Sequence, residues 1–132
     1  MKLIKEIRSK EGELHFKRWR LIKTPWFEVY IHGIYMEDLD EHLHNHPWKI
    51  WTMILWGGYL EKIHTGRIRL RRPGHISYAK ISYFHKIDKM KKVPTYSLAI
   101  VGKRINPDWG YMVDGRFIDH LTYRENKNKK RD

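Results

Sequence analysis

Histidines at alternate positions are the feature of this sequence with the clearest potential for chemistry. The segment His42–Trp48 reads HLHNHPW and places imidazoles at 42, 44 and 46. Side chains alternate faces along an extended strand, so these three would share one face. Neutral imidazole is a common ligand for zinc, iron, nickel and copper. Alternate residues lie roughly 7 Å apart, so all three can reach one ion only if the chain curls. The pattern predicts a metal site, with a histidine-rich strand that binds no metal as the alternative.

The composition limits which other sites and compartments are open to the chain. The absence of cysteine excludes disulfides, thiolate metal sites and thiol nucleophiles. The 132 residues suffice for one domain with its own core. We find neither a secretory signal nor an apolar run of the roughly 20 residues that a membrane span needs. We therefore expect a soluble, cytoplasmic protein with no membrane partner.

A strong excess of basic residues points to an anionic partner. Lysine and arginine number 27 against 15 acidic residues, which gives a formal net charge of +12. Such a balance favours nucleic acid, a nucleotide, another small anionic molecule or an acidic protein surface, with an ordinary solvated surface as the alternative. Part of the excess lies in Arg124–Asp132, which contains no apolar residue. We predict a disordered basic tail there, following one domain over residues 1–123.

Short runs of aromatic and β-branched residues between turn signals indicate an all-β sandwich or barrel. No long amphipathic helical pattern is visible. Gly57-Gly58 predicts a two-residue hairpin, and the lysine-rich run Asp88–Pro94 predicts a loop. In residues 67–72, arginine alternates with Ile68 and Leu70, which predicts a half-buried strand with outward arginines. Strands at residues 109–113 and 117–123 would close the fold.

Two motifs resemble those of the cupins, which are small jelly-roll barrels also called double-stranded β-helices. The first family motif is a His-x-His pair followed by a glutamate and a glycine. Here the pair is His44 and His46 and the glycine is Gly57 or Gly58, with Ile50 or Trp51 in the glutamate position. The second motif runs from Gly74 to His85, with Lys80 and Ser82 where proline and glycine usually stand. More loosely, the chain is similar to small cupin-like proteins carried by bacteriophages.

The resemblance implies that His44, His46 and His85 meet inside the barrel and bind one divalent transition metal. Three histidines leave coordination positions open for water or substrate. Some cupins, including thiol dioxygenases, work without the glutamate, so an oxygenase-like iron site comes first and an isomerase or hydrolase next. A zinc site or a site that has lost its metal remain alternatives, and Fe(II), Zn, Mn and Ni are not distinguished.

Further residues near the motifs are candidates for supporting roles. Glu61 is a fourth ligand or general base, or else a surface charge. Tyr83 is a hydrogen-bond donor to a bound ligand, or else a packed core aromatic. His42 is a hydrogen-bond partner of a metal ligand or an alternative ligand, or else exposed.

Three more candidates concern the substrate. Arg69 and Arg71 are able to hold a carboxylate or phosphate through forked hydrogen bonds, or else are solvated outward-facing residues. Trp51 is a candidate for the pocket wall.

The first functional hypothesis is therefore a metalloenzyme that acts on a small anionic molecule. The alternative is a non-enzymatic basic β-barrel that binds nucleic acid or a protein partner, for example a phage accessory protein. A homodimer that pairs through exposed strands, such as the N-terminal one, is also compatible with the sequence.

Overall fold

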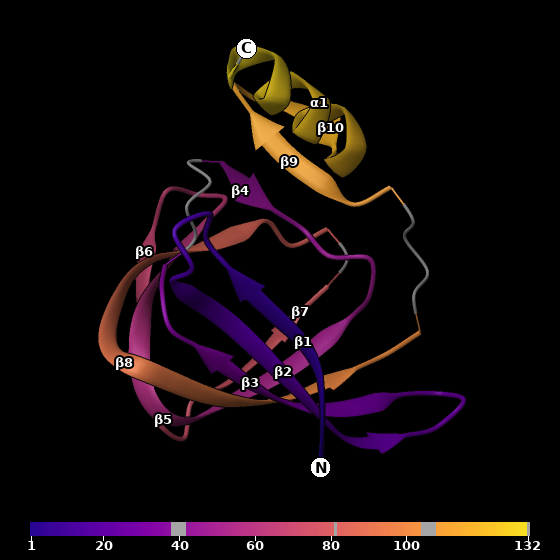
Figure 1. Cartoon of the computed structure of the whole chain (residues 1–132), viewed down its shortest axis with the longest axis vertical. Coiled ribbons are helices and arrows are strands. Elements are labelled where there is room, and N and C mark those ends of the chain that lie inside the picture. Colours follow the sequence, from indigo (N-terminus) through magenta and orange to yellow (C-terminus); the bar gives the residue numbers. More distant parts are fainter. Residues whose placement is uncertain (38–41, 81, 104–107, 132) are drawn as a thin grey trace.

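Two long, bent strands organise the protein. The computed structural model of the chain describes residues 1–37, 42–80, 82–103 and 108–131, with the side chains of 127–131 left out. Strands β5 and β8 pair antiparallel from Ile50↔Val101 to Ile63↔His85 and curve around the barrel (Figure 1). The elements are β1 (Lys2–Arg8), β2 (Leu14–Lys23), β3 (Glu28–Ile34), β4 (Leu43–His44), β5 (Ile50–Ile63), β6 (Ile68–Arg71), β7 (Ile76–Ala79), β8 (His85–Val101), β9 (Gly110–Val113), β10 (Arg116–Asp119) and α1 (His120–Arg131).

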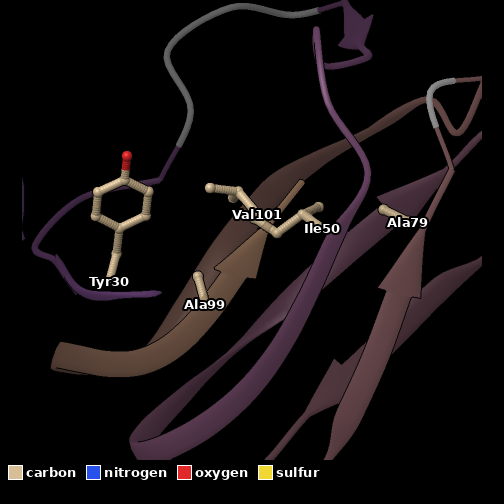
Figure 2. Close-up of a cluster of buried hydrophobic side chains, with 5 residues drawn as sticks. All are labelled: Tyr30, Ile50, Ala79, Ala99 and Val101. Carbon is tan, nitrogen blue, oxygen red and sulfur yellow. The ribbon is translucent and has the colours of Figure 1, made fainter. Parts of the chain in front are cut away.

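The sheet has ten strands within the described residues. Its main path runs β1-β2-β3-β8-β4-β9-β10, and β5 also pairs with β6, β7 and β8. Alternate residues of these strands face inward and form two apolar clusters. One contains Tyr30, Ile50, Ala79, Ala99 and Val101 (Figure 2), and the other contains Ile34, Ile54 and Tyr59. The mainly β architecture confirms the predicted fold class.

The hairpin predicted at Gly57-Gly58 is wrong, because β5 runs through both residues. Their φ angles of +91° and +146° belong to conformations that glycine adopts without a steric penalty. The Gly58 amide donates to Thr95 Oγ1 at 2.9 Å, and a Cβ on Gly57 would lie 2.5 Å from that oxygen. The pair thus bends a continuous strand against β8, with register shifts on both sides.

The loop predicted at Asp88–Pro94 is also wrong, since β8 continues through it. This stretch pairs with β5, for example Tyr59 with Met90 and Gly58 with Lys92. Met90 packs on the second apolar cluster, while Lys89, Lys91 and Lys92 are exposed. Ladder hydrogen bonds and one inward face therefore outweigh the polar composition of the segment.

Strand β6 reverses the predicted assignment of its faces. Arg71 is only 2% exposed, whereas Ile68 and Leu70 are 55% and 41% exposed. Arg71 lies opposite Tyr59, and Arg69 lies opposite Glu61, so the arginines share the face of buried β5 residues. The inner face of the barrel is polar here. Attraction to a buried carboxylate explains why Arg71 points inward.

The C-terminal segment differs from the strand and disordered tail that the sequence predicts. Strand β10 ends at Asp119, and α1 continues to Arg131, with Asp132 outside the described residues. Asp119 Oδ1 accepts a 2.6 Å hydrogen bond from the Thr122 amide, which is an N-cap interaction. Tyr123 stacks on Tyr111 at 3.8 Å between ring centroids. In the part of the chain described, no helix has the length and apolar character to cross a membrane.

Candidate metal centre

The chain turns immediately after β4, and this turn brings His44 and His46 together. The strand predicted across all three alternate histidines is wrong, because β4 covers only Leu43–His44. The buried Asn45 makes two hydrogen bonds with Gly110. Its backbone amide donates to the Gly110 carbonyl at 3.0 Å, and its side-chain Oδ1 accepts from the Gly110 amide at 2.7 Å. The spacing of the histidines required the chain to curl between them. The hydrogen bonds of Asn45 hold the chain in that turn.

Three imidazoles meet where this turn lies against the start of β8. His44 is in register with His85, and His46 Nε2 lies 2.9 Å from His85 Nε2. The ring centroids of each pair are 5.1 Å apart. One nitrogen from each of His44, His46 and His85 lies within 4.8 Å of the others, so the cluster is able to hold a metal ion.

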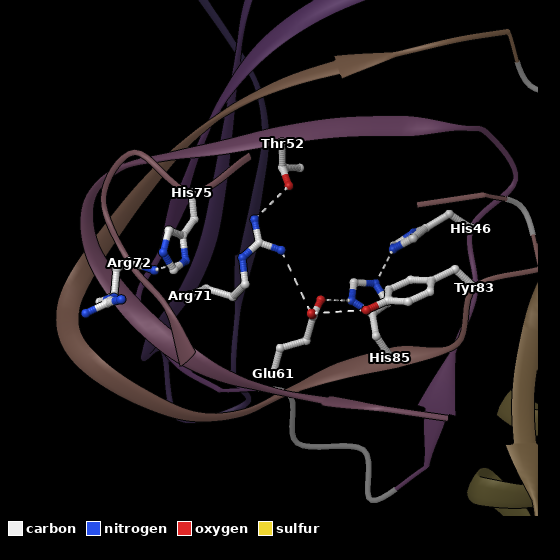
Figure 3. A network of polar contacts seen from close by, with 8 residues as sticks. All are labelled: His46, Thr52, Glu61, Arg71, Arg72, His75, Tyr83 and His85. Atoms are coloured by element: carbon white, nitrogen blue, oxygen red, sulfur yellow. Dashed lines mark hydrogen bonds and ion pairs between the residues drawn. The ribbon is translucent and has the colours of Figure 1, made fainter. Parts of the chain in front are cut away.

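A buried carboxylate orients one of the three rings. His85 Nδ1 donates to Glu61 Oε2 at 2.8 Å, so Nε2 carries the lone pair that faces the cluster (Figure 3). Tyr83 Oη donates to Glu61 Oε1 at 3.2 Å, and Arg71 Nη1 lies 3.9 Å from the same oxygen. Arg71 also donates to Thr52 Oγ1 at 3.4 Å. Glu61 is thus neither a surface charge nor a member of the histidine cluster.

The electrostatics of this network favour an ionised Glu61 and a neutral His46. Burial alone raises the pKa of Glu61, but the hydrogen bond and charge of His85 and the nearby Arg71 together lower it. Burial, followed by the Glu61 charge, raises the pKa of Tyr83 to about 12, so its hydroxyl stays a donor at neutral pH. Burial, followed by His85 and His44, holds the pKa of His46 well below 6.5. Neutral imidazole is the form that binds metal.

The structure separates the other predicted residues from the cluster. His42 Nδ1 lies 3.1 Å from Tyr123 Oη, which ties it to α1. Trp51 is 51% exposed and packs against Tyr78 with ring centroids 4.6 Å apart. Arg69 is exposed, although its charge acts on Tyr83.

The sequence reasoning missed a second polar group inside the barrel. Arg18 Nε donates to His32 Nε2 at 3.0 Å, and its guanidinium lies 4.9 Å from the Tyr30 ring centroid and 5.6 Å from that of Trp48. Burial, followed by Arg18, lowers the pKa of His32 to about 3. The available signal was an arginine on the same strand face as Phe16, within a run that reads as ordinary basic surface.

A groove of about 620 Å³ lies beside the histidine turn. It shares Asn45 with that turn, but none of the three clustered histidines lines it. Its lining residues are Asn45, Lys49, Tyr78, Lys80, Ser82, Phe84, Met112 and Phe117.

Comparison with known proteins identifies the fold but shows no closer relationship. No protein-family model and no curated protein matches the chain. A mannose-6-phosphate isomerase candidate from Ralstonia eutropha JMP134 has a TM-score of 0.60 and 15% identity, covering 67% of this chain and 84% of that one. Fe(II)-HppE with the alternative substrate (S)-1-HPP has a TM-score of 0.57 and 15% identity, covering 76% of this chain and 55% of that one. A Klebsiella pneumoniae protein with a double-stranded β-helix domain has a TM-score of 0.58 and 17% identity, covering 80% and 84%.

These similarities establish the fold, a cupin double-stranded β-helix, as the motifs predicted. Cupin-fold neighbours include enzymes that act on small molecules. The similarity to phage proteins stays a prediction, since none of the comparisons bears on it.

Proposed function

We propose that this cupin-fold chain binds one divalent transition metal through His44, His46 and His85 and is an enzyme for a small anionic molecule. The observation that carries the proposal is the cluster of three imidazoles whose ring nitrogens lie within 4.8 Å of one another. Fe(II)-HppE, a neighbour of the same fold, is an iron protein with a substrate, which supports iron among the candidate metals.

The donor set fits such an ion. The Glu61 hydrogen bond leaves His85 Nε2 available for coordination, and the lowered pKa of His46 keeps that ring neutral. Three nitrogen ligands leave positions open for a substrate, which is the pattern of catalytic rather than structural sites. A bound ion supplies Lewis acidity and, if it is iron, redox chemistry.

Glu61 acts in this proposal through His85 and not on the substrate. Its carboxylate holds the proton at His85 Nδ1 and thereby fixes the tautomer, as carboxylates commonly do behind metal-binding histidines. Tyr83 donates to the same carboxylate, and Arg71 balances its charge. We infer that these three are positioning residues.

The preference for an anionic substrate is supported by Arg18. Arg18 donates its hydrogen bond to an imidazole, and the Glu28 carboxylate acts on it through its charge. Its charge contributes to the lowered pKa of His46, so the guanidinium and the histidine cluster share one interior. A carboxylate or phosphate on the substrate would offset that charge and the charge of the ion.

Elemental analysis of protein purified without a histidine tag tests the proposal. We expect about one transition metal per chain, lost in His44→Ala and in His85→Ala. His75→Ala is the matched control, because His75 lies in the turn before β7 and contacts the Arg72 amide. A metal-free protein whose stability is the same with chelator and with added Fe(II), Zn(II), Mn(II) or Ni(II) would contradict it.

A further inference from the structure

The outer face of the sheet carries two uninterrupted rows of apolar side chains. Directly opposed residues on neighbouring strands point to the same side of a sheet, so the register identifies each row. We call the two rows together the apolar sheet face. The first row crosses six strands and contains Ile76, Met53, Leu98, Ile31, Trp19 and Leu3. The second crosses five strands and contains Tyr78, Trp51, Ile100, Val29 and Ile22.

All but one of these side chains lie outside the buried core of the barrel, the exception being Val29 at 9% exposed. Their neighbours along the strands, such as Ile50, Ala99 and Tyr30, point inward and form the first apolar cluster. Six of the eleven residues are exposed to solvent, among them Ile76 at 67% and Trp51 and Ile22 at 51% each, and four more are half-buried. Leu3, Ile100 and Tyr78 are also exposed.

The extent of this face suits a protein–protein interface. Six strands at the usual spacing span roughly 24 Å. The exposed apolar area is then on the order of several hundred Å², comparable with the roughly 800 Å² that each partner contributes to a stable interface. None of its eleven residues is charged, although the chain carries a net charge of +12.

We propose that the apolar sheet face binds a second copy of this chain, so that the protein is a homodimer with two sheets packed face to face. Uncharged apolar faces match each other in an isologous contact without charge complementarity. A partner selected by the basic charge of the chain would need cationic groups within the contact, and the two rows provide none. The metal sites remain inside the two barrels.

Salt distinguishes this pairing from binding to an anionic partner. Two chains of +12 repel each other, and added salt screens that repulsion, so self-association tightens as salt rises. A complex with nucleic acid weakens under the same change.

Sedimentation equilibrium of the full chain tests the proposal. We expect a dimer at micromolar concentrations, and we expect Trp51→Glu to weaken it by about 30-fold, the effect of losing a central aromatic. Trp26→Glu is the matched control, because Trp26 is 70% exposed and lies at the β2–β3 turn, outside both rows. It makes the same change of residue and charge and should leave the dimer intact.

Ile76→Lys provides a second disruption on another strand, and circular dichroism checks that each variant folds. Equal weakening by Trp26→Glu and Trp51→Glu would overturn the proposal, as would a monomer at every concentration and salt level. A wild-type monomer that instead binds anionic vesicles or nucleic acid would overturn it too. Metal content measured on the same samples reports separately on the proposed enzyme site.

Discussion

The two faces of β5 and β8 are not divided simply into an apolar inner face and a polar outer face. Part of the inner face carries Glu61 and His85 and lies against Arg71, so two charges are buried there beside a half-buried imidazole. The outer face carries Trp51 and Ile100, which are apolar and exposed. An interior with this many polar groups gives up hydrophobic stabilisation, and such an arrangement is typical of functional sites. An exposed apolar face is typical of surfaces that bind a partner.

The largest expected effect comes from breaking the buried ion pair on the inner face. Arg71→Ala removes the guanidinium that balances the charge of Glu61 in the interior, so we expect a loss of about 3–5 kcal/mol in the free energy of unfolding. The control is Arg69→Ala, two residues away on the same strand but exposed, with a change within about 0.5 kcal/mol. Urea denaturation measures both. If Arg71→Ala and Arg69→Ala lost the same free energy of unfolding, the buried pair of Arg71 and Glu61 would not account for the loss.

Acid should destabilise the inner face through His32. Its pKa is lowered to about 3 in the folded protein from 6.5, so the unfolded chain binds a proton at a higher pH. This contribution to stability is therefore complete above pH 6.5 and is lost as pH falls toward 3, at up to about 1.4 kcal/mol per pH unit.

Urea denaturation at several pH values measures that slope. His32→Gln should flatten it, because its amide keeps an acceptor for Arg18 but does not titrate. His75→Gln, in an exposed turn contact, should retain the wild-type slope. If the slope in His32→Gln equalled that of the wild type, groups other than His32 would be responsible for the acid sensitivity.

A smaller effect is expected from the carboxylate behind His85. Glu61→Gln should weaken metal binding by about 10–100-fold, because a neutral amide is a weaker acceptor than a carboxylate for the hydrogen bond from His85 Nδ1. Competition with a chromogenic chelator measures the affinity. Glu28→Gln is the control, since Glu28 bonds Tyr30 and Arg20 and not the histidines. Equal affinities of wild type and Glu61→Gln would remove the positioning role.

The smallest effect should come from the outer face of the monomer. Ile76→Lys should change the free energy of unfolding by within about 0.5 kcal/mol when measured in dilute solution, because the side chain is 67% exposed. Ile54→Ala, on the inner face of β5, should cost about 2–5 kcal/mol. A large loss from Ile76→Lys in the monomer would show that the outer face stabilises the single chain.

Local patterns predicted the elements that depend on local chemistry. Strand β9 lies within the strand predicted at residues 109–113, and the Asp114-Gly115 turn that follows it has φ of +50° and +80°. The histidines that now form the cluster were identified from motif spacing, although that identification depended on a family resemblance and not on geometry. Helix α1 was missed because its N-cap at Asp119 and its aromatic contacts outweigh a weak helical pattern.

Residues whose position depends on distant partners were harder to predict. The sequence left Arg71 and Glu61 each open between a functional role and a surface charge, and only their mutual contact explains why both are buried. Arg18 was overlooked for the same reason, since its partner His32 lies on another strand. Gly57-Gly58 has the composition of a hairpin, but Thr95 of β8 makes it a bend within one strand.

By itself, the sequence determined that the chain is a β-barrel with imidazoles at the spacing of a metal site, because alternation and motif spacing are properties of neighbouring residues. Only the tertiary structure decided which histidines meet, which charges are buried and which face stays apolar and open. The physical reason is that burial and ion pairing depend on groups brought together from separate strands, and Asn45, Glu61 and Arg71 acquire their roles only when those strands close.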